Sequence, residues 1–172
     1  MAEITRKELL LALIAAGEHP RLSGLDLSGL ELEHMDFHGA DLRGADLSGC
    51  VFHRANLRGA RLERANLTEA DLSHADLAKT HFSHALLYKT RLDEALLDGA
   101  DLQHALLKGA SFRQAHLHET DLRHAHLEGA HFHGAELRGS NFSGAVWDGA
   151  DFRGAILVHC IGGPSLHETR PV

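Results

Sequence analysis

A large apolar residue occupies every fifth position from Leu22 to Leu157 without a break. Of these 28 positions, 20 hold Leu, seven hold Phe and one holds Trp147, so every Phe and the only Trp fall in one column. Two residues before each large residue lies a small one, which is Ala at 19 of the 28 positions. The register holds from residue 20 to residue 159, so the sequence predicts an uninterrupted five-residue repeat without inserted loops.

A period of five fits neither a straight helix nor a flat strand. On a helix, a step of five residues rotates the large column by about 140° and spreads it around the surface. On a strand, five is an odd number, so successive large residues would point to opposite faces. The large column points inward throughout only if the chain turns a corner in every repeat. A quarter turn per repeat closes a square coil, so that one coil consists of four repeats.

Three segments show the repeat in its clearest form: residues 40–44 (ADLRG), 45–49 (ADLSG) and 55–59 (ANLRG). They resemble the pentapeptide repeat family, whose motif is A-(D/N)-L-X-X. The resemblance covers residues 20–159 and implies an all-β fold, a right-handed quadrilateral (four-sided) β-helix solenoid of about seven coils. With a strand spacing of about 4.8 Å per coil, the rod would be roughly 34 Å long.

The N-terminal segment, residues 1–19, is predicted to form a cap, which a solenoid needs to cover the apolar cross-section at its end. Thr5 and Glu8 have the spacing of a capping box, and Ile4 and Leu9 that of a hydrophobic staple. An apolar stripe follows, formed by Leu9, Leu10, Leu13 and Ile14. We expect residues 5–16 to form a short amphipathic α-helix over the first coil. The stripe is short and its basic flank minimal, so a membrane-binding role is not expected.

The predicted C-terminal tail, residues 160–172, begins where the sequence CIGGP (160–164) breaks the register. This tail is polar and has no helical stripe. The sequence leaves open whether the tail folds over the last coil or a second subunit covers it. A homodimer through an end or a face of the rod is therefore one expected assembly.

Composition narrows the classes of function. The chain has 17 Lys and Arg against 24 Asp and Glu, a formal charge of −7, so direct nucleic-acid binding is not expected. Its longest apolar run, Leu9 to Ala16, is too short to span a membrane, and no signal peptide is recognised, which favours a cytoplasmic protein. The two cysteines form no disulfide framework, and Cys50 lies in the inner small column, where a buried, inert thiol is expected.

No catalytic motif emerges from the sequence. There is no nucleophile elbow, phosphate-binding loop or zinc-spaced set of Cys and His. The Asp residues between the inner columns occupy the polar position of the repeat itself. We therefore predict a protein that is not an enzyme, with no catalytic or metal-binding residues and no cofactor.

The 16 histidines form one ordered pattern. His84, His104 and His124 recur at every fourth repeat and should stack in a ladder at one corner, with Arg64 below it and His81 beside it. Three interpretations are open: a solvated surface, a pH-sensitive or interaction face, and a transition-metal site. The solvated surface is favoured because a corner position accepts any polar residue.

The outward position between the inner columns offers a candidate interaction surface. Leu86 and Leu106 should stack there on adjacent coils, with Tyr88 at the neighbouring position and Val146 two coils further on. We expect Leu86, Tyr88 and Leu106 to be exposed to solvent on one face, as a partner surface would be. The alternative is ordinary tolerance of scattered exposed aliphatic residues.

These observations favour a non-enzymatic protein–protein interaction module or scaffold, built on a rigid solenoid, whose partner is unknown. One alternative is a DNA-mimicking protein that binds gyrase, a type II topoisomerase, as fluoroquinolone-resistance pentapeptide proteins do. Residues 20–39 carry a charge of −3, but each of the next six segments of the same length carries between +1 and −1, unlike such mimics. The other alternative is a bacterial secretion-associated adaptor or effector, suggested by the opening LDLSGL at residues 25–30.

Overall fold

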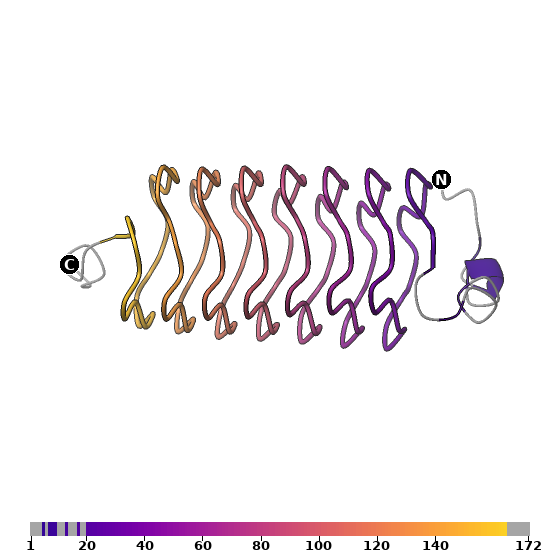
Figure 1. Cartoon of the computed structure of the whole chain (residues 1–172), viewed down its shortest axis with the longest axis horizontal. Helices are drawn as coiled ribbons and strands as arrows, with labels where there is room; N and C mark the ends of the chain where they lie inside the picture. Colours follow the sequence, from indigo (N-terminus) through magenta and orange to yellow (C-terminus); the bar gives the residue numbers. More distant parts are fainter. Residues whose placement is uncertain (1–4, 6, 10–12, 14–16, 18–19, 165–172) are drawn as a thin grey trace.

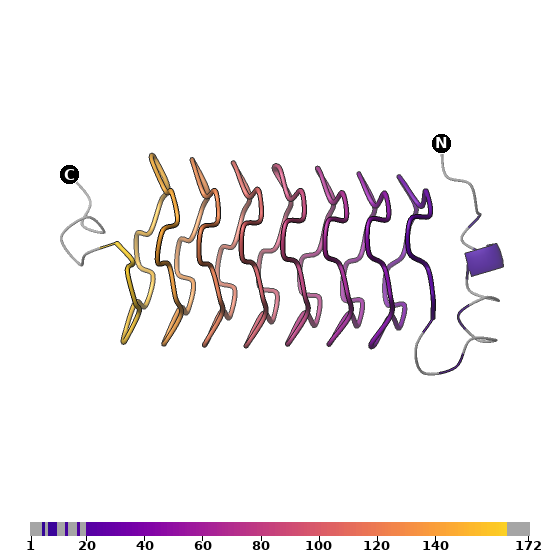
Figure 2. The same ribbon diagram turned by 45° about the horizontal axis from the view of Figure 1, so that its top comes forward.

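The computed structural model describes residues 5, 7–9, 13, 17 and 20–164 (Figure 1). Residues 20–161 wind around one long axis in stacked coils, seen from two directions in Figures 1 and 2. Helical residues, 7–9 and 13, lie at the N-terminal end of the winding. No helix in this described part of the chain has the length and apolarity needed to cross a membrane.

Single-residue β-bridges hold neighbouring coils together. Every fifth residue pairs in parallel with its counterpart four repeats later, from Arg21 with Asp41 to Asn141 with Ile161. Four repeats are the length that the sequence predicts for one coil. The described residues contain no strand longer than one bridge, because the chain turns again after each of them. Counted from its small residue, each repeat thus has a small, a bridging and a large position, followed by two turn positions.

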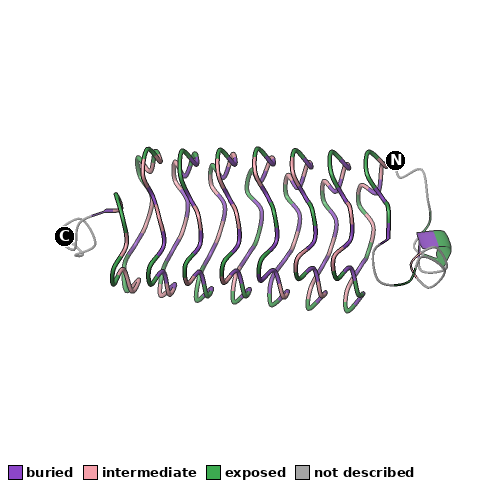
Figure 3. Cartoon of the chain, viewed as in Figure 1, coloured by how far each residue is buried: buried purple, intermediate pink, exposed green. Residues whose placement is uncertain are grey.

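The large column fills the axis of the rod. Its residues from Leu22 to Phe142, together with Phe152, expose at most 5% of their surface. Buried segments recur along the whole winding (Figure 3). Phe112, Phe132 and Phe152 stack with successive ring centroids 4.7 Å apart, which matches the spacing between paired strands. The inward direction predicted for this column is confirmed. Only Trp147 and Leu157, near the C-terminal end of the rod, are partly buried.

Polar residues of the small column find partners inside the core. The hydroxyls of Thr80 and Thr90 donate to the carbonyl oxygens of Leu57 and Leu67, each at 2.8 Å. The Sγ atom of Cys50 lies 2.9 Å from the carbonyl oxygen of Leu27, and burial raises the pKa of this thiol to about 11. Cys50 is therefore a protonated structural thiol, in agreement with its inner position.

The second turn position has a backbone conformation that the sequence analysis did not anticipate. All 28 of these residues have positive φ, and 14 of them are not glycine. Six of the 14 are His, a residue that tolerates the left-handed region better than most. Part of the unusual histidine content therefore has a backbone cause.

Hydrogen bonding explains why the bridging position so often holds Asp or Asn. All 12 such side chains accept a hydrogen bond from the amide two residues later, at 3.0–3.3 Å. These turn amides donate to no backbone carbonyl within the described chain. The Asp side chains of this column thus serve the fold, because each satisfies an otherwise unpaired amide.

The N-terminal helix contacts the hydrophobic core. Glu8 Oε2 accepts a hydrogen bond from the Thr5 amide at 2.8 Å, and Thr5 Oγ1 accepts one from the Glu8 amide at 3.3 Å. This reciprocal pair is a capping box. Leu9 is fully buried, and Leu13 packs against the core. Three residues of the predicted staple and stripe lie outside the described residues: Ile4, Leu10 and Ile14.

At the C-terminal end, the bridges continue two residues past the boundary predicted at residue 159. Cys160 takes a small position, with its Sγ atom 2.9 Å from the carbonyl oxygen of Leu137. The Ile161 amide donates to the carbonyl oxygen of Ser140 at 3.0 Å. Within the described residues, the regular pairing therefore reaches Ile161. Residues 165–172 of the predicted tail lie outside the described part.

Candidate functional site

Stacking of the bridging residues gives the rod four sides. The first side begins at Arg21, the second at Asp26, the third at Glu31 and the fourth at Asp36, and each gains one bridging residue per coil. The first and third sides are opposite, as are the second and fourth, because half a coil separates them. Each candidate site can therefore be assigned to one side.

The predicted apolar surface lies on the second side. Leu86 and Leu106 pair directly across adjacent coils, and His126 separates them from Val146. Tyr88 and Val146 are exposed, at 36% and 39% of their surface. Leu86 and Leu106 are half-buried, although the sequence predicted that both would be exposed. We call these four residues, Leu86, Tyr88, Leu106 and Val146, the apolar strip.

Charged residues border the apolar strip. Tyr88, Lys89, Lys108 and Glu128 are among the residues that line a groove next to it. Lys89 Nζ lies 3.6 Å from Glu69 Oε1, and both side chains are largely exposed. The strip is thus an apolar centre with a rim of both charges, the arrangement usual in protein interfaces.

The predicted histidine ladder forms at the corner between the first and second sides. The rings of His84 and His104 stack at a centroid distance of 4.9 Å and an angle of 3°, and those of His104 and His124 at 4.9 Å and 9°. The lone pairs of an imidazole lie in the ring plane, so rings in nearly parallel planes do not direct them to one point. This geometry suits a stacked surface and does not suit the chelation of a single metal ion.

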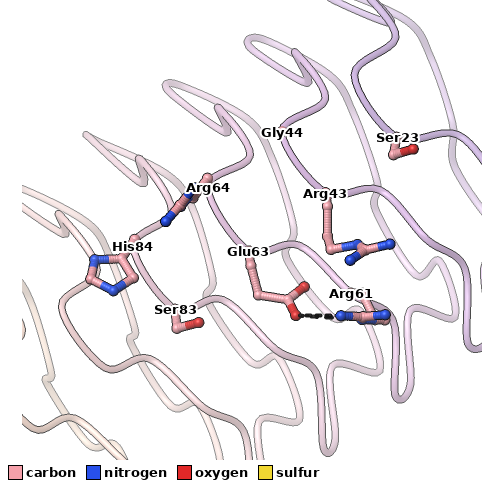
Figure 4. Close-up of a pocket in the computed structure, with 8 residues that line it drawn as sticks. All are labelled: Ser23, Arg43, Gly44, Arg61, Glu63, Arg64, Ser83 and His84. Carbon is pink, nitrogen blue, oxygen red and sulfur yellow. Dashed lines mark hydrogen bonds and ion pairs between the residues drawn. The ribbon is translucent and has the colours of Figure 1, made fainter.

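A basic groove extends from the N-terminal end of the ladder (Figure 4). It is lined by Arg43, Arg61, Arg64 and His84, together with Glu63 and smaller residues. Glu63 Oε1 lies 3.2 Å from the Arg61 guanidinium. Hydrogen bonds from Arg43 lower the pKa of Asp41 to about 2, so this Asp stays ionised beside its arginine. Two of the three arginines are therefore already neutralised by carboxylates.

The fourth side brings together three residues that the sequence analysis did not connect: His116, His118 and Glu136. Their possible ligand atoms all lie within 4.8 Å of one another, and no other group of His, Cys, Asp and Glu in the described chain meets this criterion. Glu136 lies one full coil after His116, so the length of a coil alone predicts that these two residues are neighbours. The histidine ladder repeats one residue type at this period, whereas this cluster combines histidine with glutamate.

Comparison with known families identifies the repeat. A model described as "Pentapeptide repeats (8 copies)" matches residues 21–54, 45–83, 55–93, 65–103 and 95–134. A second model, "Pentapeptide repeats (9 copies)", matches residues 122–160. Together the two models account for the chain from residue 21 to residue 160.

Solved structures of the same type resemble the chain. Trypsin-treated QnrB1, a plasmid-mediated fluoroquinolone resistance protein, is 25% identical over 81% of this chain and 78% of its own, with a TM-score of 0.51. HetL, a protein of Nostoc sp. strain PCC 7120 involved in heterocyst differentiation regulation, is 26% identical over 92% and 93%, with a TM-score of 0.28. The protein alr5209 of Nostoc PCC 7120 is 31% identical over 71% and 80%, with a TM-score of 0.35. Among curated proteins, no significant match was found.

Proposed function

The chain belongs to the pentapeptide repeat family, and from this premise we propose that it is a non-enzymatic interaction module that acts in the cytoplasm. Members of this family form right-handed, four-sided β-helices and are in general structural or interaction modules. In this proposal, seven coils form a rigid rod whose N-terminal end is covered by the helix of Leu9 and Leu13. One side of the rod then contacts a protein partner.

The apolar strip carries this proposal. Leu86 and Leu106 are paired in consecutive coils, and Val146 lies further along the same side. Tyr88 lies in the turn that follows Leu87, and Tyr88 and Val146 are both exposed. At the bridging position, Asp or Asn would satisfy a turn amide, so leucines there forgo a hydrogen bond that the fold otherwise uses. An apolar patch on the partner would compensate by removing these side chains from water.

Leu86→Glu/Leu106→Glu should abolish capture of the partner while leaving the rod folded. The two leucines are half-buried and their new carboxylates can reach solvent, so we expect a stability loss of about 1 kcal/mol, including repulsion across the coils. Binding should fail because two like charges would have to lose water at the interface. A photo-crosslinking residue in place of Tyr88 identifies the partner, and binding is then measured with both proteins purified.

Leu96→Glu is the matched control, because Leu96 is a bridging leucine on the opposite side and 41% exposed. This control should bind the partner as the wild type does. Retained binding by Leu86→Glu/Leu106→Glu would exclude the strip as the interface. A large drop in the melting temperature of that variant would instead place the leucines in the core.

The likeness to QnrB1 favours a second candidate function, fluoroquinolone resistance through gyrase binding. Charge argues against it. Duplex DNA carries one negative charge per about 1.7 Å, so a coil with a rise of about 4.8 Å needs a charge of about −3 to match it. Residues 20–39 reach −3, but every later segment of the same length lies between +1 and −1. Carboxylates such as Asp121 and Asp151 are in addition paired with arginines.

Accordingly, the purified protein at micromolar concentration should neither inhibit supercoiling by gyrase nor protect the enzyme from a fluoroquinolone. A supercoiling assay with and without the drug measures both effects, with QnrB1 as the positive control. Protection comparable to that given by QnrB1 would overturn the charge argument and make gyrase the partner. The secretion-associated role stays a prediction from the sequence.

A further inference from the structure

We propose that His116, His118 and Glu136 bind one divalent transition-metal ion, with Zn²⁺ as the expected ion. His116 and Glu136 are bridging residues that pair across adjacent coils on the fourth side, and His118 follows His116 at the first turn position. Two imidazoles and one carboxylate are a donor set that suits zinc and its neighbours in the transition series. A bound ion would join the coil of residues 100–119 to that of residues 120–139.

Distances within the cluster already approach those of a metal site. His118 Nε2 lies 3.2 Å from Glu136 Oε2. Ligand atoms that each lie about 2.1 Å from a tetrahedral zinc ion are separated by about 3.4 Å. The remaining ligand atoms lie within 4.8 Å, a gap that side-chain rotation closes. An ion could therefore enter with little movement of the backbone.

Ring orientation distinguishes this cluster from the histidine ladder. The rings of His116 and His118 meet edge to face, with centroids 6.0 Å apart and planes at 81°. Because these planes intersect, a single point can lie in both, where each ring can direct a lone pair. The parallel rings of His84, His104 and His124 share no such point.

The three side chains are not needed for the hydrogen bonding of the fold. The His118 amide, which an Asp or Asn at position 116 would cap, donates instead to Asp98 Oδ1 of the preceding coil at 2.9 Å. Glu136 is not paired with Arg138, although Asp41, Asp121 and Asp151 each pair with the arginine two residues later. In the described chain, His118 is the one ion-pair partner of Glu136.

The surroundings admit an ion. His118 and Glu136 side chains are half-buried, at 30% and 37% exposure, so they are partly held in place but reachable. They line a groove together with Glu119, Arg138 and His159, which brings one further carboxylate, one guanidinium and one further imidazole near the site. Three protein ligands leave the fourth position of a tetrahedral ion for water.

A matched control exists on the third side. His131 and His133 have the same spacing and the same bridging and turn positions as His116 and His118. The residue paired with His131 in the next coil is Asp151, whose carboxylate is held by Arg153 Nε and Nη2 at 2.8 and 2.7 Å. This side therefore offers two histidines without an available carboxylate.

Isothermal titration calorimetry of the full chain with ZnCl₂ near neutral pH tests the proposal. Wild type should show one site of higher affinity above the weak background expected from the many surface histidines. Glu136→Gln and His118→Ala should each lower the affinity of that site at least about tenfold. His131→Ala/His133→Ala should retain it. Mildly acidic buffer should weaken binding to wild type, because protons compete for the imidazoles.

Two further readouts separate binding from folding. Zn²⁺ should raise the melting temperature of wild type and of the His131→Ala/His133→Ala control but not that of Glu136→Gln. Co²⁺ should give the intense visible absorption of four-coordinate cobalt with the same two proteins. Equal zinc affinity in wild type and Glu136→Gln, or loss of the site in the control, would overturn the assignment.

Discussion

Replacing Leu102 by Asp should abolish folding of the rod. Leu102 is fully buried at a large position near the middle of the repeats. A carboxylate at this place would lie in the hydrophobic core, and burying it without a partner costs several kcal/mol. The total free energy of unfolding of a domain is typically about 5–15 kcal/mol, so little stability would remain. Circular dichroism and thermal unfolding measure the effect.

Leu102→Met serves as the control, because it keeps the volume and apolar character and should cost less than about 1.5 kcal/mol. If the Asp variant melted within a few degrees of wild type, the inward column would be misassigned at this coil. The comparison therefore tests the register of the repeats independently of any function.

Deletion of residues 1–17 should cause concentration-dependent self-association. Leu9, at present fully buried in the core, would be lost, and the partly buried Leu25 and Leu30 of the first coil would be uncovered. The bridging residues from Arg21 to Asp36 have no preceding coil, so the deletion would also free their backbone edge for pairing with another molecule. Light scattering coupled to size-exclusion chromatography, over a range of concentrations, measures the mass.

Single substitutions show whether the self-association results from loss of the apolar contact or only from shortening of the chain. Leu9→Glu should reproduce the self-association, whereas Lys7→Glu, at an exposed helical position two residues earlier, should behave like the full chain. A truncated protein that keeps the mass of wild type at high concentration would show that the helix is not the cap.

Periodic burial made the core predictable from the sequence. The large and small columns repeat every five residues, and the only way to bury both throughout is to turn a corner in each repeat. The spacing of four repeats between paired residues follows from this requirement, as does the stacking of His84, His104 and His124. The contacts between coils follow directly from the repeat, since each coil contacts only its neighbours.

Features that depend on side-chain rotation or local backbone conformation were not predictable in the same way. The exposed fraction of Leu86 depends on how far the neighbouring side chains extend from the rod, so a bridging position alone does not make it exposed. Continuation of the bridges to Ile161 depends on the ability of Cys160 to replace Ala at a small position. The coil period places His116 beside Glu136, but the contact of His118 with Glu136 depends on the rotamers of both residues, which the period does not fix.

Pairing at a fixed distance of four repeats has a consequence for how such a protein changes length during evolution. Loss or duplication of a whole coil would shorten or lengthen the rod by about 4.8 Å and keep every remaining residue on its own side. Loss of a single repeat would instead rotate all later residues by a quarter turn relative to the earlier ones. A missing repeat between Leu106 and Val146, for example, would move Val146 to an adjacent side. Natural length variants with a conserved binding side should therefore differ by whole coils and not by single repeats.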